Sequence, residues 1–224
     1  MNAAGIIEKL DILSEKMDDA ELLLWLEGAC ASFEAEHPDD DVGAAALFNE
    51  LGGICRRNGW YERGEKAFLR AKEGLERSGV ADGNYATTLN NLAGLYRLSG
   101  DYERSAEYFS RCRELYEAMP EFPVDVLASV CNNLGLLHLD AGRYGEALEE
   151  FAKAETMIAA IHENAYVHAV TAGNSGFAHF RLGDRTKAAE MMLRAARFAR
   201  GIDDGGEMQR NYMSLYHQLG GKEE

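Results

Sequence analysis

Four glycines recur at an almost constant interval along this chain of 224 residues. They are Gly59, Gly100, Gly142 and Gly183, which are 41, 42 and 41 residues apart. Each glycine stands between two segments whose apolar residues recur every three or four positions, which is the period of an α-helix. A fixed interval of this length indicates an array of stacked structural units. The sequence therefore predicts a stack of helical pairs, each with a turn at its glycine.

The residues around each glycine repeat as well. A small residue recurs at one position of the first helix of every pair: Gly52, Ala93, Gly135 and Gly176. A large residue recurs at one position of the second helix: Phe68, Phe109 and Phe151, with Met192 in the fourth unit. A larger side chain at the small positions would push the helices apart. We therefore expect the two helices of a pair to approach closely there.

Residues that break helices fall between these pairs. The expected junctions are 37–43, 78–84, 120–124 and 203–206, and they contain all three prolines of the chain. The predicted pairs cover 43–78, 85–119, 125–161 and 166–201. Residues 4–36 read as a degenerate first repeat or an N-terminal cap, and 206–219 as a lone capping helix. These segments predict one continuous domain.

This pattern resembles the tetratricopeptide repeat, whose helical pair carries Leu-Gly, Tyr, a turn Gly, and then Ala, Phe and Ala. Residues 89–112 (LNNLAGLYRLSGDYERSAEYFSRC) and 131–154 (CNNLGLLHLDAGRYGEALEEFAKA) match best, whereas the fourth unit departs at Arg185 and Met192. The family's repeat is about 34 residues long. The longer period here is similar to that of kinesin light chains, which share the opening NNLA of Asn90–Ala93. The resemblance implies an all-α fold, a right-handed superhelix of about five helical pairs plus a C-terminal capping helix.

In such a stack the first helix of every pair lines a concave wall. Asparagines recur on this predicted wall in two columns: Asn49, Asn90 and Asn132 form one, and Asn91, Asn133, Asn174 and Asn211 form the other. An amide both donates and accepts hydrogen bonds, so it can pair with the backbone of a peptide whatever its side chains. We expect the first column to face a ligand. The second column either does the same or braces the neighbouring repeat.

Four arginines fall on or beside the same wall: Arg56, Arg97, Arg181 and Arg210. A guanidinium pairs with a carboxylate through two parallel hydrogen bonds, so these residues favour an acidic or carboxylate-bearing peptide. The alternative is that they are solvated helix faces. Four apolar side chains near the C-terminal half of the wall either form a pocket or lie under the capping helix: Leu136, Leu139, Phe177 and Phe180.

Composition and motifs argue against several classes of function. The net charge of −15 argues against nucleic acid or an anionic membrane as the main partner. The four cysteines lack zinc-site spacing, and catalytic or phosphate-binding motifs do not occur, so we expect no metal, no cofactor and no enzymatic activity. We find neither an export signal nor an apolar run that could span a bilayer, and we expect a cytoplasmic protein.

The sequence therefore predicts a non-enzymatic adaptor that binds an extended peptide or partner segment in a concave groove. Two alternatives stay open. One is a scaffold that associates with further copies of itself, as a homo-oligomer. The other is a regulatory domain that senses a small peptide.

Overall fold

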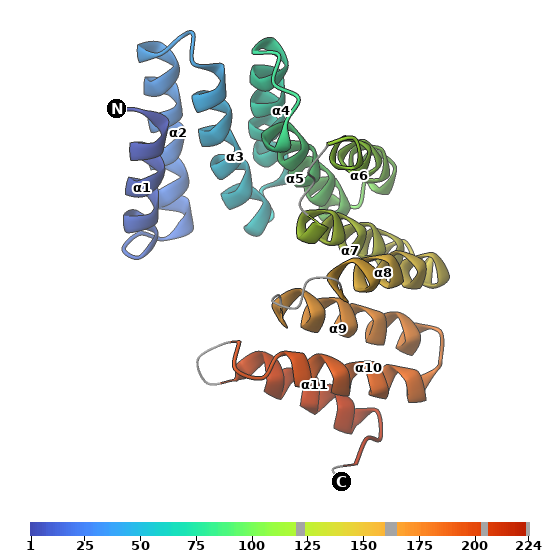
Figure 1. Ribbon diagram of the computed structural model, residues 1–224. Helices are drawn as coiled ribbons and strands as arrows, with labels where there is room; N and C mark the ends of the chain where they lie inside the picture. The colour runs from blue at the N-terminus through green and yellow to red at the C-terminus, as the bar shows by residue number, and fades with distance from the viewer. Residues whose placement is uncertain (120–123, 160–164, 203–205, 223–224) are drawn as a thin grey trace. The chain divides into compact units, whose positions relative to one another are not determined.

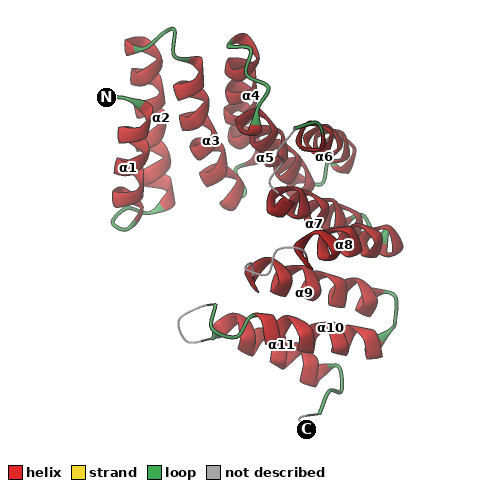
Figure 2. Cartoon of the chain, viewed as in Figure 1, coloured by secondary structure: helices red, strands yellow, loops and turns green. Residues whose placement is uncertain are grey.

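The computed structural model describes residues 1–119, 124–159, 165–202 and 206–222. The described residues form eleven α-helices and no β-strand (Figures 1 and 2). Their contacts divide the chain into two compact units, Met1–Leu115 and Tyr116–Glu224. The all-α class is confirmed. That the chain forms a single domain stays a prediction. Of the predicted junctions at 120–124 and 203–206, residues 120–123 and 203–205 lie outside the described residues.

The helices follow one another in pairs (Figure 1). The helices of the first unit are α1 (Ala3–Ser14), α2 (Asp19–Glu36), α3 (Asp41–Arg57), α4 (Tyr61–Arg77), α5 (Gly83–Ser99) and α6 (Tyr102–Glu117). The helices of the second unit are α7 (Val124–Asp140), α8 (Tyr144–Ala159), α9 (Ala165–Arg181), α10 (Arg185–Phe198) and α11 (Glu207–Gln218). No helix in the described part is both long enough and apolar enough to cross a membrane.

All four predicted turn glycines adopt the left-handed backbone conformation, with φ of 73°, 86°, 75° and 84° in chain order. This conformation costs glycine little, because it has no Cβ to clash with the preceding carbonyl. After each glycine, the next backbone N–H donates to a carbonyl five residues back, as Asp101 does to Tyr96 at 2.8 Å. This bond closes the first helix and directs the chain into the second.

The predicted close approach is confirmed in the three pairs whose small residue is glycine. A Cβ added at Gly52 would lie 2.5 Å from the Phe68 ring, and one added at Gly135 would overlap Phe151. Both phenylalanines are completely buried. In the fourth pair Met192 takes the place of phenylalanine, is 1% exposed, and packs against Gly176. The long, flexible side chain of methionine therefore fills the space that an aromatic ring fills elsewhere.

Successive pairs stack in the same way in both units. In the first unit α1 packs against α3 and α3 against α5, and α2 and α4 each contact the first helix of the next pair. In the second unit α7 packs against α9, and α11 packs against α10. Tyr212 of α11 also lies over Gly173 of α9. None of the residues of α11 is fully buried, as expected for a capping helix.

Candidate functional site

A cavity of about 400 Å³ lies in the first unit between α1, α3 and α5. Both wall residues that the sequence predicts on α3, Asn49 and Arg56, line it together with Ala46 and Gly53 of the same helix. The other lining residues are Ile7, Val42, Ala45, Glu50, Arg57, Leu75, Asn84, Thr87 and Asn91. The spacing of three and four residues places the α3 positions on one helical face, which explains why they meet at one surface.

Small side chains leave room for this cavity. Ala45, Ala46 and Gly53 project little or nothing from α3. On α5, a Cβ added at Gly94 would lie 3.1 Å from Nη1 of Arg56. Gly94 therefore makes space for the guanidinium of Arg56 between the two helices.

Asn49 connects α3 to α5. Its Nδ2 donates to Oγ1 of Thr88 at 2.8 Å, and the Thr88 hydroxyl donates to the carbonyl of Asn84 at 2.9 Å. The Oδ1 atom of Asn49 is buried and has no hydrogen-bond partner in the described part of the chain. The amide is thus held in one orientation by α5 while its acceptor is left unused.

Positive charge gathers where α3 ends. Nη1 of Arg56 donates a long hydrogen bond of 3.4 Å to Oδ1 of Asn91. Burial lowers the pKa of Arg56, and the nearby charges of Arg57 and Arg97 lower it further. Among the described residues neither Arg56 nor Arg57 forms an ion pair, whereas other arginines of this unit, such as Arg70, do pair with carboxylates.

Glu50 lies beside this positive cluster in the same cavity. Loss of solvent around its carboxyl group raises its pKa, and the negative charge of Asp11 raises it further. Arg57 acts in the opposite direction. The cavity thus combines amides, guanidinium groups and one carboxyl whose charged form is disfavoured.

On α5 the cavity is lined by Thr87 and Asn91, and Asn90 is not among its lining residues. At this helix the second column reaches the cavity, which is one of the two alternatives that the sequence left open for it. Asn84 lies seven residues before Asn91 on the same helical face and was missed. Its position two turns before Asn91 is the signal that could have identified it.

The asparagines of the second unit join helices to one another. Nδ2 of Asn174 on α9 donates to Oδ1 of Asn132 on α7 at 3.0 Å, and Asn132 is only 8% exposed. This contact braces neighbouring pairs. Asn133 is half-buried on α7. A role for these three residues in binding a peptide stays a prediction.

The structure brings only some of the predicted arginines together. Arg56 and Arg97 lie close enough for their charges to interact. Arg181 belongs to the second unit, where its guanidinium lies 4.8 Å from the ring centre of Tyr144 and donates to the Tyr144 hydroxyl. Arg210 is exposed on α11.

The four apolar residues predicted near the C-terminal half of the wall separate into two groups. Leu136 and Leu139 pack against the buried core around Phe151. Phe177 and Phe180 instead line a pocket of about 210 Å³ with Met192 of α10 and two leucines of α11. The capping helix therefore forms one side of this pocket.

The thiol groups of the chain are buried. All four cysteines are buried and free of disulfides, and burial raises the pKa of Cys30 and of Cys112 to about 12. In the described part of the chain, no three His, Cys, Asp or Glu residues lie where they could hold a metal ion together.

Two sequence models of the tetratricopeptide repeat match this chain, at residues 43–118 and 127–154. These two segments are tetratricopeptide repeats. The matches cover nearly all of the pairs α3/α4 and α5/α6 and most of α7/α8. They include Asn132 and every lining residue of the first cavity except Ile7 and Val42. No curated protein sequence matches this tetratricopeptide-repeat protein.

Solved structures share the fold at low sequence identity. The crystal structure of BtubC (BKLC) from P. vanneervenii has a TM-score of 0.75 and 20% identity, over 91% of this chain and 84% of that one. The nearly identical TPR-like repeats of a putative kinesin light chain from Podosopora anserina have a TM-score of 0.67 and 15% identity, over 85% of this chain and 92% of that one. NprR in complex with its cognate peptide NprX has a TM-score of 0.65 and 13% identity, over 96% of this chain and 66% of that one. The fold is thus an all-α repeat superhelix with kinesin light chain-like repeats.

Proposed function

We propose that this protein is a non-enzymatic adaptor whose first unit binds an acidic, extended segment of another polypeptide. Tetratricopeptide repeats suggest protein–protein interaction, and NprR, which shares the fold, binds its cognate peptide. The observation that carries the proposal is the arginine pair of the α1/α3/α5 cavity. Arg56 and Arg57 lie in a cavity of about 400 Å³ and form no ion pair with a carboxylate of the described residues, although the charge of Arg57 acts on Glu50.

A carboxylate in this cavity would remove an unfavourable interaction. The positive charges of Arg57 and Arg97 act on Arg56, whose guanidinium is also partly removed from water. A bound carboxylate supplies the opposite charge, and hydrogen bonds to charged groups contribute about 1.5–3 kcal/mol each. The cavity therefore favours Asp or Glu in the bound segment, although the protein as a whole is strongly acidic.

The amides of α5 suit the backbone of such a segment. Asn84 and Asn91 both line the cavity and are seven residues apart on one face. A rise of about 1.5 Å per residue puts their Cα atoms about 10 Å apart along the helix. That distance corresponds to about three residues of an extended chain. The two amides can thus pair with peptide groups of one extended segment.

A library of random peptides displayed on phage tests this proposal. We expect selection on the protein to enrich peptides with Asp or Glu, and the double variant Arg56→Gln, Arg57→Gln to lose most of that binding. The matched control is Arg63→Gln, because Arg63 is exposed on α4 and does not line the cavity. Selected peptides without acidic residues, or peptides that bind the double variant as well as they bind the wild type, would refute the proposal.

A further inference from the structure

The pocket of the second unit has an apolar floor and a cationic rim. Phe177 and Phe180 on α9 remain 41% and 44% exposed at its mouth, and Met192, Leu215 and Leu219 complete its apolar lining. Its volume of about 210 Å³ is sufficient for one large apolar side chain. No residue of the described chain fills it.

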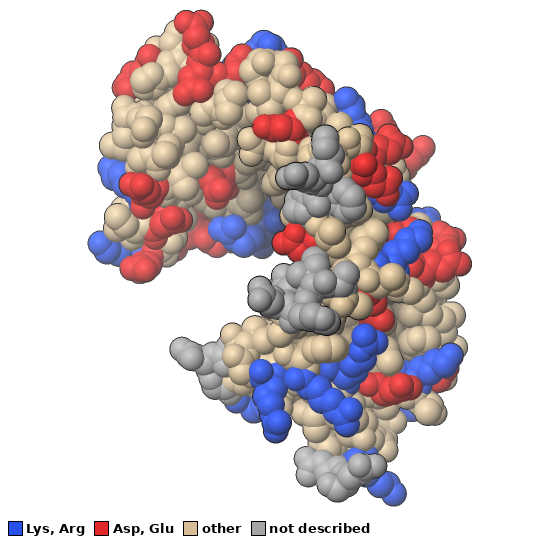
Figure 3. Space-filling model, in the orientation of Figure 1, with Lys and Arg blue, Asp and Glu red and all other residues tan. Residues whose placement is uncertain are grey.

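One arginine stands at the rim of this pocket, in a segment that is basic by composition. Arg185 lines the pocket, and its Nη2 donates to the carbonyl of Gln218 at 3.2 Å, which holds the guanidinium at the rim. Arg181 directly follows Phe180. Residues 165–222 carry eight basic and five acidic side chains in a protein of net charge −15. Figure 3 shows Lys and Arg gathered over the part of the second unit that contains α10 and α11.

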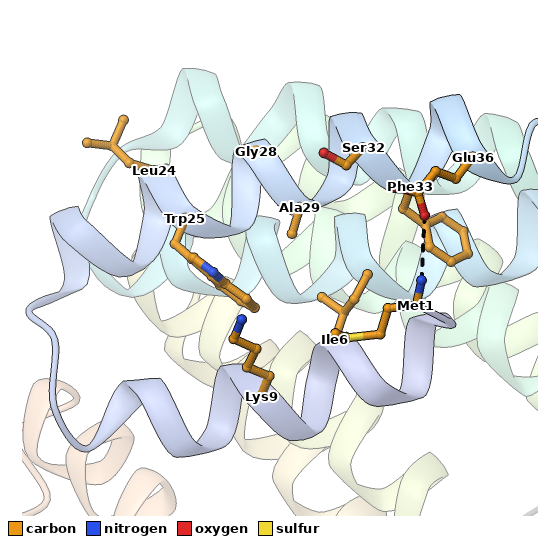
Figure 4. A pocket seen from close by; sticks show the side chains of 10 residues that line it. All are labelled: Met1, Ile6, Lys9, Leu24, Trp25, Gly28, Ala29, Ser32, Phe33 and Glu36. Atoms are coloured by element: carbon orange, nitrogen blue, oxygen red, sulfur yellow. Dashed lines mark ion pairs between the residues drawn. The ribbon is translucent and has the colours of Figure 1, made fainter.

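The first unit exposes a side chain of the complementary kind. Leu24 on α2 is 65% exposed, the highest value among the large exposed hydrophobic residues of the described chain. Figure 4 shows Leu24 pointing away from α1, whereas its neighbour Trp25 points toward Lys9 of α1. Leu24 is thus not engaged in the packing of its own helical pair.

Carboxylates flank Leu24 on the same face of α2. Glu21 and Glu27 lie three residues before and three residues after it, which places both beside it on the helix surface. Residues 1–40 as a whole carry eleven acidic and two basic side chains. An apolar side chain between two carboxylates is the complement of an apolar pocket with a guanidinium group at its rim.

We propose that the pocket of α9, α10 and α11 binds Leu24 of a second copy of this chain, with Glu21 and Glu27 of that copy facing Arg185 and the basic surface around it. The contact uses different surfaces on the two copies, so it is a head-to-tail contact that can propagate from copy to copy. One side chain with flanking ion pairs buries little area, which predicts weak association with a dissociation constant on the order of 100 μM. None of these residues lines the cavity of the first unit, so the two proposals stand or fall separately.

Sedimentation equilibrium of the full chain tests the association. We expect the average mass to rise with concentration past that of a dimer, and added salt to reduce it because the ion pairs are exposed. Leu24→Arg and Phe180→Asp should each weaken association at least about tenfold, because each removes buried apolar area and places like charges together. The control Ile12→Arg changes a 55% exposed hydrophobic residue of α1 and should leave association unchanged.

Mixing the two variants separates this proposal from a symmetric dimer. The Leu24→Arg chain keeps its pocket and the Phe180→Asp chain keeps its Leu24, so an equal mixture should form a dimer and nothing larger, while each variant alone is a monomer. The proposal is overturned if the wild type stays monomeric at about 1 mM or if the mixture stays monomeric. It is also overturned if the Ile12→Arg chain loses association to the same extent as the Leu24→Arg chain. Unchanged melting temperatures check that both variants fold.

Discussion

The side-chain amide of Asn174 donates to the side-chain oxygen of Asn132 at 3.0 Å, and this bond joins α9 to α7 across two consecutive repeats. Asn132 is 8% exposed, so the bond lies in a largely dry contact between the two helices. The recurrence of asparagine at these repeat positions therefore serves the stacking of repeats in the second unit.

We expect Asn132→Ala to lower the free energy of unfolding by about 1–2 kcal/mol, because it leaves the Asn174 amide without its acceptor. Asn174→Ala should cost a similar amount, and the double variant should cost less than the sum of the two. Urea denaturation of the four proteins measures this coupling. Additive losses would show that the two amides act independently.

Gly135→Ala should destabilise the protein by about 1–3 kcal/mol, because the added methyl group overlaps the buried ring of Phe151. Gly28→Ala on α2 is the matched control, since no atom lies within 4 Å of the methyl group that it adds. In the control, the higher helix propensity of alanine should increase stability by up to about 1 kcal/mol. Melting temperatures that shift in the same direction for both variants would contradict this account.

The affinity for an acidic peptide should rise as the pH falls through the pKa of Glu50. The pKa of Glu50 is raised above its ordinary value, so this group loses its negative charge at a pH where the carboxylates of a peptide are still ionised. Asp11 and Arg57 are the charged groups that act on it, and protonation removes the repulsion between Glu50 and the ligand. Binding measured by fluorescence polarisation should show this rise in the wild type. The Glu50→Gln variant should show none of it.

Salt should weaken the same binding. The arginine cluster is partly open to solvent, so raising the ionic strength from about 0.05 to 0.5 M screens its attraction for carboxylates. We expect the dissociation constant to increase several-fold in the wild type and much less in the Arg56→Gln, Arg57→Gln variant. An affinity for acidic peptides that is independent of salt would count against recognition by charge.

The cysteines should resist thiol reagents in the folded protein. The nucleophile is the thiolate, and burial raises the pKa of Cys30 and of Cys112 to about 12, so almost none is present at pH 8. A colorimetric disulfide reagent should detect almost no reactive thiol at pH 8 under native conditions and all four after unfolding in guanidinium chloride. Rapid reaction of Cys112 without unfolding would contradict the buried placement.

Much of the fold follows from local rules that the sequence displays directly. The glycines at the turns are required by a left-handed backbone, and the pairing of Gly52 with Phe68 follows from the period of the repeat. These features depend on residues within one helical pair. Their spacing along the chain was therefore enough to predict the pairs and their close contacts.

The identity of the side chains that face a cavity depends on the next helix. On α5, Asn91 rather than Asn90 lines the cavity. On α7, Asn132 is covered by Asn174. Leu136 packs against the core, whereas Phe177 stays exposed. A small rotation of one helix against its neighbour exchanges adjacent residues between wall and contact, and helical periodicity leaves that rotation undetermined. The sequence by itself determined the helical pairs, and only tertiary packing decided which polar side chains remain available to a ligand, because that choice is made between helices rather than within one.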